Sequence, residues 1–365
     1  MTRYETVREV VTHPDVKKNP VHWRAWREGR IRPDWQLISW VAAENMLARD
    51  DDDHTRLRKL VSKAFTPRRV EGMRARIEEL VEELLDRMAA GGPVADVKAD
   101  YAYPLPMTVI SDLFGVDDDG SRDELHRRIG MMFDQTITPE QALENHEGTQ
   151  RFLTGLIERK RSSPADDMTS ALIAARDEDN DRLSESELVW TLILIIGAGF
   201  ETTMNVLTNA VQALLTHRDQ LDLVVRGERS WSDAVEETLR WNTSIQNVPL
   251  RFAAKDLVVE GTTIPAGDAL LVSYGSAGRD PRVHGDTADR FDLTREDKSH
   301  VSFSHGPHYC LGANLARMEL NTALPALFAR FPDMELLDTD PEQVPSIVSN
   351  GVVTLRVRLG EERKG

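Results

Sequence analysis

The 365-residue sequence contains a single cysteine, which excludes an internal disulfide and any structural zinc site built on several thiolates. Positive charge is also scarce, because 45 Lys and Arg residues stand against 61 Asp and Glu residues, for a net charge of −16. So acidic a chain has no general attraction for nucleic acid or anionic lipid. We therefore expect no nucleic-acid partner and no oxidising, secreted environment.

Long apolar runs are missing as well. The N-terminal residues contain no apolar segment of the kind that a signal peptide needs. The longest uncharged apolar stretch, Val189 to Phe200, has 12 residues, whereas a transmembrane helix needs roughly 20. The sequence therefore predicts a cytoplasmic protein without a membrane span. With 40% apolar residues, the chain can still bury a substantial core.

Apolar residues recur at helical spacing along most of the chain, and no Pro-, Gly- or Ser-rich linker divides it. The acidic run Asp50 to Asp53 favours a helix start, and Ser184 with Glu187 fits a capping box. Amphipathic patterns cover residues 57–64 and 73–85. Further helices are predicted at about 105–115, 121–133, 140–161, 166–176, 184–216, 218–226 and 231–241.

Strand signals are confined to short segments. Residues 256–259 and 262–264, joined at Glu260 and Gly261, predict a hairpin. Residues 269–273 and 352–359 are two more strand candidates. The predicted fold class is mainly α with small β-sheets, in one domain over residues 1–365.

The segment around the lone cysteine is the most informative part of the chain. Cys310 directly precedes a helical pattern, where backbone N–H groups and the helix dipole stabilise a thiolate. Gly306 and Gly312 allow a tight loop and a close approach to a flat ligand. A lone cysteine is otherwise most often buried and inert, and a protease nucleophile would need a partnered His and an oxyanion hole. The glycine-rich context favours a functional thiolate.

Phe303, Gly306, His308, Cys310 and Gly312 together resemble the signature of the cytochrome P-450 family. The resemblance implies that Cys310 is the axial ligand of a haem iron. It also implies that Phe303 covers the sulfur, that His308 reaches a haem propionate, and that haem b and dioxygen are used. The first residues resemble a segment that family members reach after a first helix and strand, so the N-terminus is expected to be shortened.

Two further segments resemble cofactor-binding parts of this family. Arg251 follows Pro249-Leu250, and His54 precedes Arg58 by four residues on one helical face. Two propionates in a partly dry cavity need several cationic donors. Singly, each residue could be a solvated surface charge. Together with the cysteine segment, the pattern predicts that His54, Arg58, Arg251 and His308 bind the cofactor.

Glu237 and Arg240 lie three residues apart, which by itself describes an ordinary surface ion pair. In the family that the sequence resembles, such a pair is buried and a third residue completes it. Arg290 and Arg295 are the two candidates for that residue. The resemblance implies a structural network that holds the cysteine loop and does no chemistry.

Residues 192–200 are apolar on every helical face and are followed by an acid, which on its own describes a core helix with a polar interruption. Thr202 can bond back to the carbonyl of Ala198 and bend the helix. Ala198, Gly199, Glu201 and Thr202 match an Ala-Gly-x-acid-Thr pattern of the family. The resemblance implies that Ala198 lies against the haem and that Glu201 and Thr202 are catalytic, relaying protons during dioxygen activation.

The substrate pocket is predicted by family correspondence alone. It places around the pocket the segment from Trp23 to Trp40, Ser349, and Leu194, Gly197, Ile245, Val248 and Val348. Because these residues are largely apolar, a lipophilic small molecule is the expected substrate. The acidic chain resembles bacterial members that tailor macrolides, other polyketides or steroids.

The resemblance also implies redox partners, namely a ferredoxin and a ferredoxin reductase, with NAD(P)H as the indirect electron source. A basic patch could steer an acidic ferredoxin by charge complementarity, and the same residues could equally form a solvated helix face. The patch consists of Arg56, Lys59, Lys63, Arg68 and Arg69.

Three functions remain open at this point. The leading hypothesis is a haem-thiolate monooxygenase that hydroxylates or epoxidises its substrate. The second is a thiolate-haem enzyme that uses peroxide directly, and the third is a non-catalytic haem or ligand-binding protein. The intact pair Glu201 and Thr202 favours the first, because the other two need no proton relay.

Overall fold

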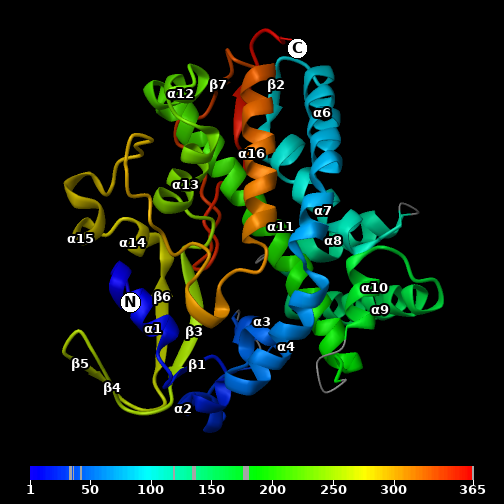
Figure 1. Cartoon of the computed structure of the whole chain (residues 1–365), viewed down its shortest axis with the longest axis vertical. Coiled ribbons are helices and arrows are strands. Elements are labelled where there is room, and N and C mark those ends of the chain that lie inside the picture. Colours follow the sequence, from blue (N-terminus) through cyan, green and yellow to red (C-terminus); the bar gives the residue numbers. More distant parts are fainter. Residues whose placement is uncertain are drawn as a thin grey trace.

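The computed structural model describes residues 1–32, 35, 37–41, 43–117, 120–133, 137–175 and 181–363 (Figure 1). The mainly helical fold class with small sheets is confirmed. The α-helices are α1 (Tyr4–Thr12), α2 (Arg24–Arg27), α3 (Ile38–Val41), α4 (Asp51–Ala64), α5 (Pro67–Gly72), α6 (Arg74–Ala90), α7 (Pro104–Phe114), α8 (Ser121–Phe133), α9 (Pro139–Ser162), α10 (Met168–Ala174), α11 (Glu185–Thr216), α12 (Arg218–Val225), α13 (Trp231–Trp241), α14 (Tyr274–Gly278), α15 (Pro281–His284) and α16 (Ala313–Arg330).

The shorter elements connect these helices. The 3-10 turns are η1 (Pro20–His22), η2 (Met46–Ala48), η4 (Gly285–Thr287) and η5 (Gly306–His308), and η3 (Lys98–Ala102) is a π-helical turn. The strands are β1 (Val16–Lys17), β2 (Val94–Asp96), β3 (Asn247–Ala253), β4 (Leu257–Val259), β5 (Thr262–Ile264), β6 (Ala269–Ser273), β7 (Glu335–Leu336) and β8 (Arg356–Arg358).

The helices predicted from periodicity are confirmed. The prediction for 166–176 corresponds to α10, whose start is fixed by Asp167, which accepts from the backbone N–H of Ser170; Arg176 lies outside the described residues. The acidic run stands in the first turn of α4, and Ser184 and Glu187 form both halves of the capping box of α11.

The sheets are small and antiparallel, in the orders β1-β3-β6, β2-β8-β7 and β4-β5. The predicted hairpin is β4-β5, and residues 269–273 form β6. The strand predicted over 352–359 is wrong in length, because only Arg356–Arg358 pair with the short partners β2 and β7. Val352 makes only an isolated bridge to Gln343.

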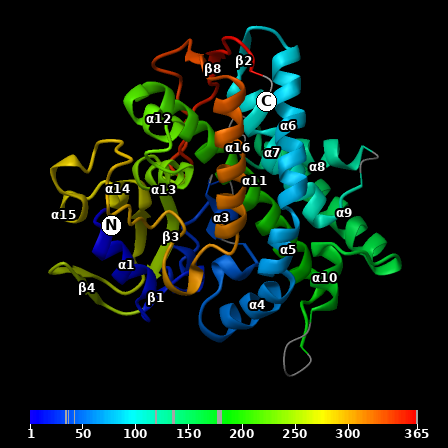
Figure 2. The same ribbon diagram turned by 45° about the horizontal axis from the view of Figure 1, so that its top comes forward.

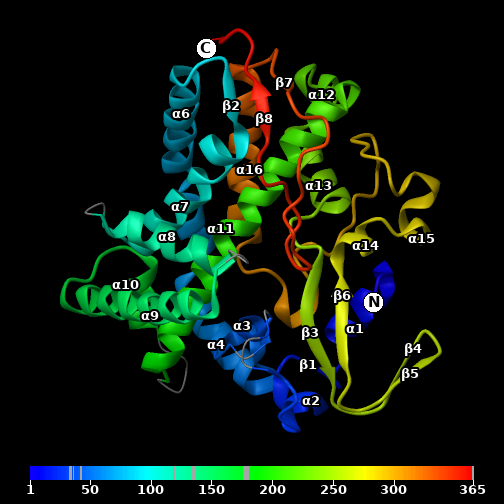
Figure 3. The same cartoon turned by 180° about the vertical axis from the view of Figure 1, so that it is seen from behind.

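The longest helix, α11, crosses the interior and is packed by α7, α9, α13, α16 and η3 (Figures 1 and 3). Among the described residues it is the one helix long and apolar enough to span a membrane, yet 61% of its most apolar window is buried inside the protein. A core helix has the same length and composition. Here α11 serves as the central support of the helical core.

A second, smaller apolar cluster lies beside the helical core and joins α1 to the β1-β3-β6 sheet. Figures 1 and 2 show the loop that leads into α16, in orange, between this sheet, α1 and α4. The cysteine segment therefore lies where the helical core meets the sheet.

Candidate active site

Cys310 lies in a tight loop three residues ahead of Ala313, the first residue of α16, whose N-cap is Gly312. Its backbone N–H donates to the carbonyl of Phe303 at 2.8 Å, which closes the loop. Gly306 has φ +72°, and a Cβ there would lie 2.5 Å from Cγ2 of Thr12 in α1. Only glycine accepts both the left-handed backbone and this close approach.

The Cys310 side chain is exposed to water from one side. The protein around the rest of the thiol is dense enough that burial raises its pKa. The backbone N–H groups of Gly312 and Ala313, and the charges of Arg58 and Arg317, act in the opposite direction. The helix terminus and two arginines therefore favour the thiolate form that a metal ligand requires.

One face of α11 borders an open space, although the helix is otherwise buried along its central turns. Leu194 and Thr202 are partly exposed and Ala198 is exposed, at a spacing of four residues that puts all three in one row. The Thr202 hydroxyl donates to the Ala198 carbonyl at 2.6 Å, as the sequence predicted. Gly199 faces elsewhere, because a Cβ there would lie 2.7 Å from Cδ1 of Ile110 in α7.

Glu201, next to Thr202, is 7% exposed. Its carboxylate is hydrogen-bonded to the side chains of Ser349 and Asn205. Burial raises the pKa of Glu201, and the charge of Lys98 and these hydrogen bonds act against that rise. The two predicted relay residues therefore differ in environment. Glu201 is a buried acid near Ser349, whereas the Thr202 hydroxyl lies on the partly exposed face of α11.

Five basic residues gather beside the cysteine loop, and we call them the basic cluster: Lys18, His54, Arg58, Arg251 and His308. The rings of His54 and His308 lie 4.2 Å apart between centroids. Arg251 is 3% exposed, and its Nε has no hydrogen-bond partner. The Lys18 ammonium donates to the carbonyls of Pro249 and Leu250 at 3.1 and 3.2 Å.

Burial and mutual repulsion oppose positive charge in this cluster. Burial lowers the pKa of Lys18 to about 7, helped by the charge of Arg251. Burial also lowers the pKa of His308 to about 2, helped by its four basic neighbours. In the part of the chain that the structure describes, none of the five forms an ion pair with a carboxylate. The nearby Asp50 instead accepts from the backbone of Lys18 and Asn19.

The basic cluster thus fits an anionic group that the protein does not itself supply, and the two carboxylates of haem meet that need. The surroundings of Cys310 also fit a flat group, since a Cβ at Gly312 would have no atom within 4 Å. Of the residues predicted to bind the cofactor, His54, Arg251 and His308 lie together, and Arg58 donates to the Tyr309 carbonyl at 2.7 Å beside them.

Lys18 is a member that the sequence did not reveal. It stands next to Lys17, and no local pattern separates the two residues. Lys17 reaches the exposed Asp51, whereas Lys18 is 3% exposed. Only the pairing of β1 with β3, which puts Val16 opposite Ala253, turns Lys18 inward.

Glu237 and Arg240 are both fully buried in α13 and form a two-fold ion pair with donor–acceptor distances of 2.7 and 2.8 Å. Arg240 also donates to three backbone carbonyls of the following loop, those of Gly278, Ala288 and Arg290. Of the two candidate partners, the Arg295 side chain lies 3.5 Å from Glu237, and Arg290 contributes its carbonyl. The network ties α13 to the loop before the cysteine segment.

The residues predicted to line a substrate pocket have mixed exposure. Leu194, Ile245 and Val248 are partly exposed, whereas Gly197 and Val348 are buried. In the segment from Trp23 to Trp40, Trp23 stacks on Phe252 at 5.4 Å and contacts Trp35. Pro33, Asp34, Gln36 and the side chain of Trp40 lie outside the described residues.

The predicted basic patch is partly neutralised. Arg56 pairs with Asp181 and Glu187, and Arg69 pairs with Asp166. Arg68 is exposed. The patch therefore carries less free positive charge than its five residues suggest.

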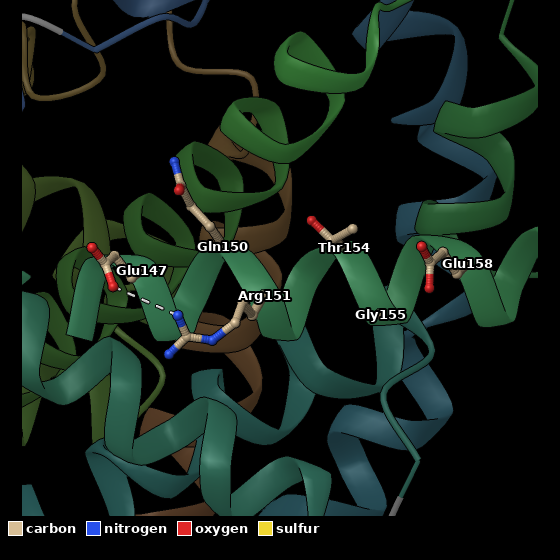
Figure 4. Close-up of a pocket in the computed structure, with 6 residues that line it drawn as sticks. All are labelled: Glu147, Gln150, Arg151, Thr154, Gly155 and Glu158. Carbon is tan, nitrogen blue, oxygen red and sulfur yellow. Dashed lines mark ion pairs between the residues drawn. The ribbon is translucent and has the colours of Figure 1, made fainter. Parts of the chain in front are cut away.

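Figure 4 shows an open groove on α9, lined by Glu147, Gln150, Arg151, Thr154, Gly155 and Glu158. Glu147 and Arg151 form an ion pair across one turn. All six residues belong to one helix and none to the cysteine loop, so this groove is separate from the candidate site.

Comparisons with known proteins agree with this geometry. A family model described as Cytochrome P450 matches residues 140–224 and 232–357. The chain is 44% identical over 364 residues to 2-hydroxy-5-methyl-1-naphthoate 7-hydroxylase of Streptomyces carzinostaticus, covering 98% of the chain and 88% of that relative. It is 41% identical over 323 residues to 6-deoxyerythronolide B hydroxylase of Saccharopolyspora erythraea, covering 87% and 78%.

A solved structure of testosterone-bound CYP154C4 from a Streptomyces species superposes with a TM-score of 0.95. It is 42% identical in sequence, and the match covers 100% of this chain and 90% of that one. The chain therefore belongs to the cytochrome P450 family and is a cytochrome P450 monooxygenase.

Proposed function

We propose that this enzyme inserts one oxygen atom from dioxygen into a C–H bond, or across a C=C bond, of a lipophilic secondary metabolite or steroid. The observation that carries the proposal is the joint placement of Cys310 and the basic cluster. An exposed thiol at a helix N-terminus adjoins five basic residues that lack a carboxylate partner among the described residues.

Haem b, when bound, supplies the redox-active iron that activates dioxygen. The protein's own residues have separate tasks in this scheme. Cys310 ligates the metal, and His54, Arg58, Arg251 and His308, joined by Lys18, bind the carboxylates. Phe303 shields the sulfur, Gly306 lets the loop approach α1, and Gly312 leaves room for the ring. Ala198, exposed on α11, would lie against the cofactor.

Glu201 and Thr202 hold and move the protons that the reaction consumes. Burial raises the pKa of Glu201 and so favours its protonated form, which is the form that can donate a proton. The Thr202 hydroxyl donates to Ala198 at rest and can turn toward a proton acceptor in the open space. In T202A we expect electrons to be consumed with less product and more peroxide. Unchanged coupling in T202A, with T203A as the buried neighbour control, would overturn this assignment.

Apolar side chains support the proposed substrate class. Leu194, Ile245 and Val248 offer partly exposed aliphatic surface for the proposed lining, and Gly197 and Val348 are buried. Relatives are described as hydroxylases of a naphthoate, a macrolide precursor and vitamin D(3). A bulky, mainly apolar molecule with few charges matches both observations.

Electrons are proposed to come from NAD(P)H through a ferredoxin reductase and a ferredoxin, in the cytoplasm. The basic patch lies on α4 and α5, next to Arg58, whose guanidinium contacts the cysteine loop. An acidic ferredoxin docked there would stand near the sulfur.

The decisive measurement is the absorption spectrum of the reduced protein under carbon monoxide. A strongly red-shifted Soret band is expected for wild type, and C310A should lack it. If C310A has the wild-type spectrum, the proposal is wrong. A panel of polyketides, aromatic polyketide acids and steroids, monitored for spin-state shift and then by mass spectrometry with ferredoxin and NADPH, identifies the substrate class. Binding without any product would favour a non-catalytic protein.

A further inference from the structure

A second group of polar and charged residues surrounds the Phe303 ring. We call it the Glu236 cluster, and it consists of Glu236, His300 and Arg317. Arg317 of α16 donates to the Glu236 carboxylate through Nε at 2.5 Å and through a terminal nitrogen at 2.9 Å. Its guanidinium carbon lies 4.6 Å from the centroid of the Phe303 ring. This distance is within the range of a cation–π contact.

His300 completes the cluster. The backbone N–H of Ser302 donates to His300 Nδ1 at 3.2 Å. His300 Nε2 lies 3.0 Å from the Glu236 carboxylate, within hydrogen-bonding distance. The imidazole ring lies 5.8 Å from that of Phe303. Phe303 is contacted by both partners of Glu236.

The cluster is connected to the cysteine in two ways. The Phe303 carbonyl accepts from the Cys310 N–H, so the ring and the sulfur belong to one closed loop. Arg317 also stands in α16, the helix that begins three residues after Cys310. Glu236 stands on α13 and Arg317 on α16, so two packed helices fix the arrangement.

We propose that Glu236, His300 and Arg317 are positioning residues that hold the Phe303 ring and a neutralised cation beside Cys310, and thereby protect its bond to iron. This inference rests on the proposed function. Glu236 is the centre of the cluster because it binds both other members. Without its carboxylate, Arg317 loses two hydrogen bonds and its charge partner, and its side chain, 29% exposed, is free to turn toward water.

The test compares E236Q, R317M and the double variant E236Q/R317M. The readout is the rate at which the reduced carbon monoxide complex loses its red-shifted Soret band. Each single variant should accelerate that loss by about threefold or more, the scale of one cation–π contact. The double variant should lose the band more slowly than the product of the two single effects predicts, because Glu236 and Arg317 act through one contact. H300F, which keeps the ring but removes the donor to Glu236, should change the rate in the same direction.

D112N is the matched control. Asp112 on α7 also accepts from two arginines, Arg76 at 2.9 Å and Arg122 at 2.5 Å, and it is similarly half-buried. D112N should leave the rate unchanged, and thermal unfolding of all variants shows whether folding itself is impaired.

A second readout is the ferric–ferrous equilibrium of the haem at a fixed applied potential. A threefold change in that ratio corresponds to ~30 mV for a one-electron couple. R317M removes a cation near the sulfur and should favour the ferric form, whereas D112N should leave the ferric–ferrous ratio unchanged. An unchanged ratio in R317M would overturn the assigned electrostatic role.

The positioning role is overturned if E236Q matches D112N, if the two single effects multiply in the double variant, or if H300F leaves the rate unchanged. Failure of the proposed function looks different, because wild type itself would then lack the red-shifted band. Should R317M fail to fold, R317K takes its place, because it keeps the charge without the planar guanidinium. Loss of the Soret band at the wild-type rate in E236Q would by itself contradict the inference.

Discussion

Two groups of buried charges near the cysteine loop differ in how completely they are paired. Arg240 uses all its N–H groups, two on Glu237 and three on backbone carbonyls, and both residues are fully buried. Arg251 is almost as deeply buried, yet its Nε has no partner. Its neighbours Lys18, His54 and His308 are also basic.

The difference indicates what each group is for. A buried ion pair with every hydrogen bond satisfied adds no binding capacity, but breaking it is costly, so it fixes the backbone that surrounds it. Buried cations without an anion destabilise the fold unless a ligand neutralises them. Pairing, rather than burial, therefore separates the structural network from the ligand site.

The largest expected effect on stability comes from breaking the Glu237–Arg240 network. R240M leaves the Glu237 carboxylate buried with the Asp292 N–H and Arg295 beside it, and should cost about 3–5 kcal/mol of unfolding free energy. The control is K160M, which removes the ion pair of Lys160 and Asp167, whose side chains are 11% and 5% exposed. Denaturant unfolding measures both. A loss in R240M no larger than that in K160M would remove the basis of the comparison.

The next effect concerns Glu319, a buried acid with no ion pair to a cation among the residues that the structure describes. Glu319 is 1% exposed, its Oε2 has no partner, and burial raises its pKa to about 8. The folded state then holds a proton that the unfolded state releases, so stability should fall as the pH rises from about 4.5 to about 8. The loss is on the order of several kcal/mol.

E319Q should abolish this dependence and be more stable than wild type at pH 8. At pH 4 the two proteins should differ little, because both states of wild type are then largely protonated. E335Q, at an exposed glutamate of β7, is the control and should follow wild type throughout. Parallel stability curves for E319Q and wild type would show that Glu319 is charged or solvated in the fold.

The basic cluster should respond to substitution in the opposite way to the Glu237–Arg240 network. R251M removes a buried cation that lacks a carboxylate partner, so the haem-free protein should lose little or no stability. The holoprotein should release haem about tenfold faster, since one charged hydrogen bond to a carboxylate is lost. Y274F is the control, because it removes a hydroxyl near Arg251 and keeps the Arg251 charge. If haem-free R251M is destabilised as strongly as R240M, Arg251 is structural.

The fold was predictable wherever the pattern was local. Helices such as α9 and α11 bury one face or all faces over many turns, and periodicity and caps then mark them within two residues. Strand β3 was not predicted, because its pairing is with β1, more than 200 residues earlier, and with β6 across a bulge. Such strands depend on tertiary partners that no short window contains.

The candidate site divides along the same line. Cys310 and Phe303 lie in one continuous motif, and Thr202 and Ala198 are one helical turn apart, so sequence was sufficient to find them. Lys18 and Arg317 were missed because their importance lies in what they approach. Arg317 bonds to a residue 81 positions away, and sequence spacing carries no record of such a contact.

The smallest expected effect is on the rate of reduction by ferredoxin. It depends on which arginines of the basic patch are paired with acids. Arg56 and Arg69 are held by acids, whereas Arg68 is exposed and has no ion pair within the part of the chain that the structure describes. R68E should therefore slow reduction by an acidic ferredoxin a few-fold at low salt, and the difference should vanish at high salt. Stopped-flow reduction over a salt series measures this.

R226E, at the exposed C-cap arginine of α12, which pairs with Asp222, carries the same charge change away from the patch. This variant should be reduced at the wild-type rate. R56E should have a weaker effect on docking than R68E, because Arg56 already forms ion pairs with Asp181 and Glu187. If R56E and R226E slow reduction as much as R68E does, net charge governs the encounter and pairing does not. Equal rates in all three variants and wild type would place ferredoxin elsewhere.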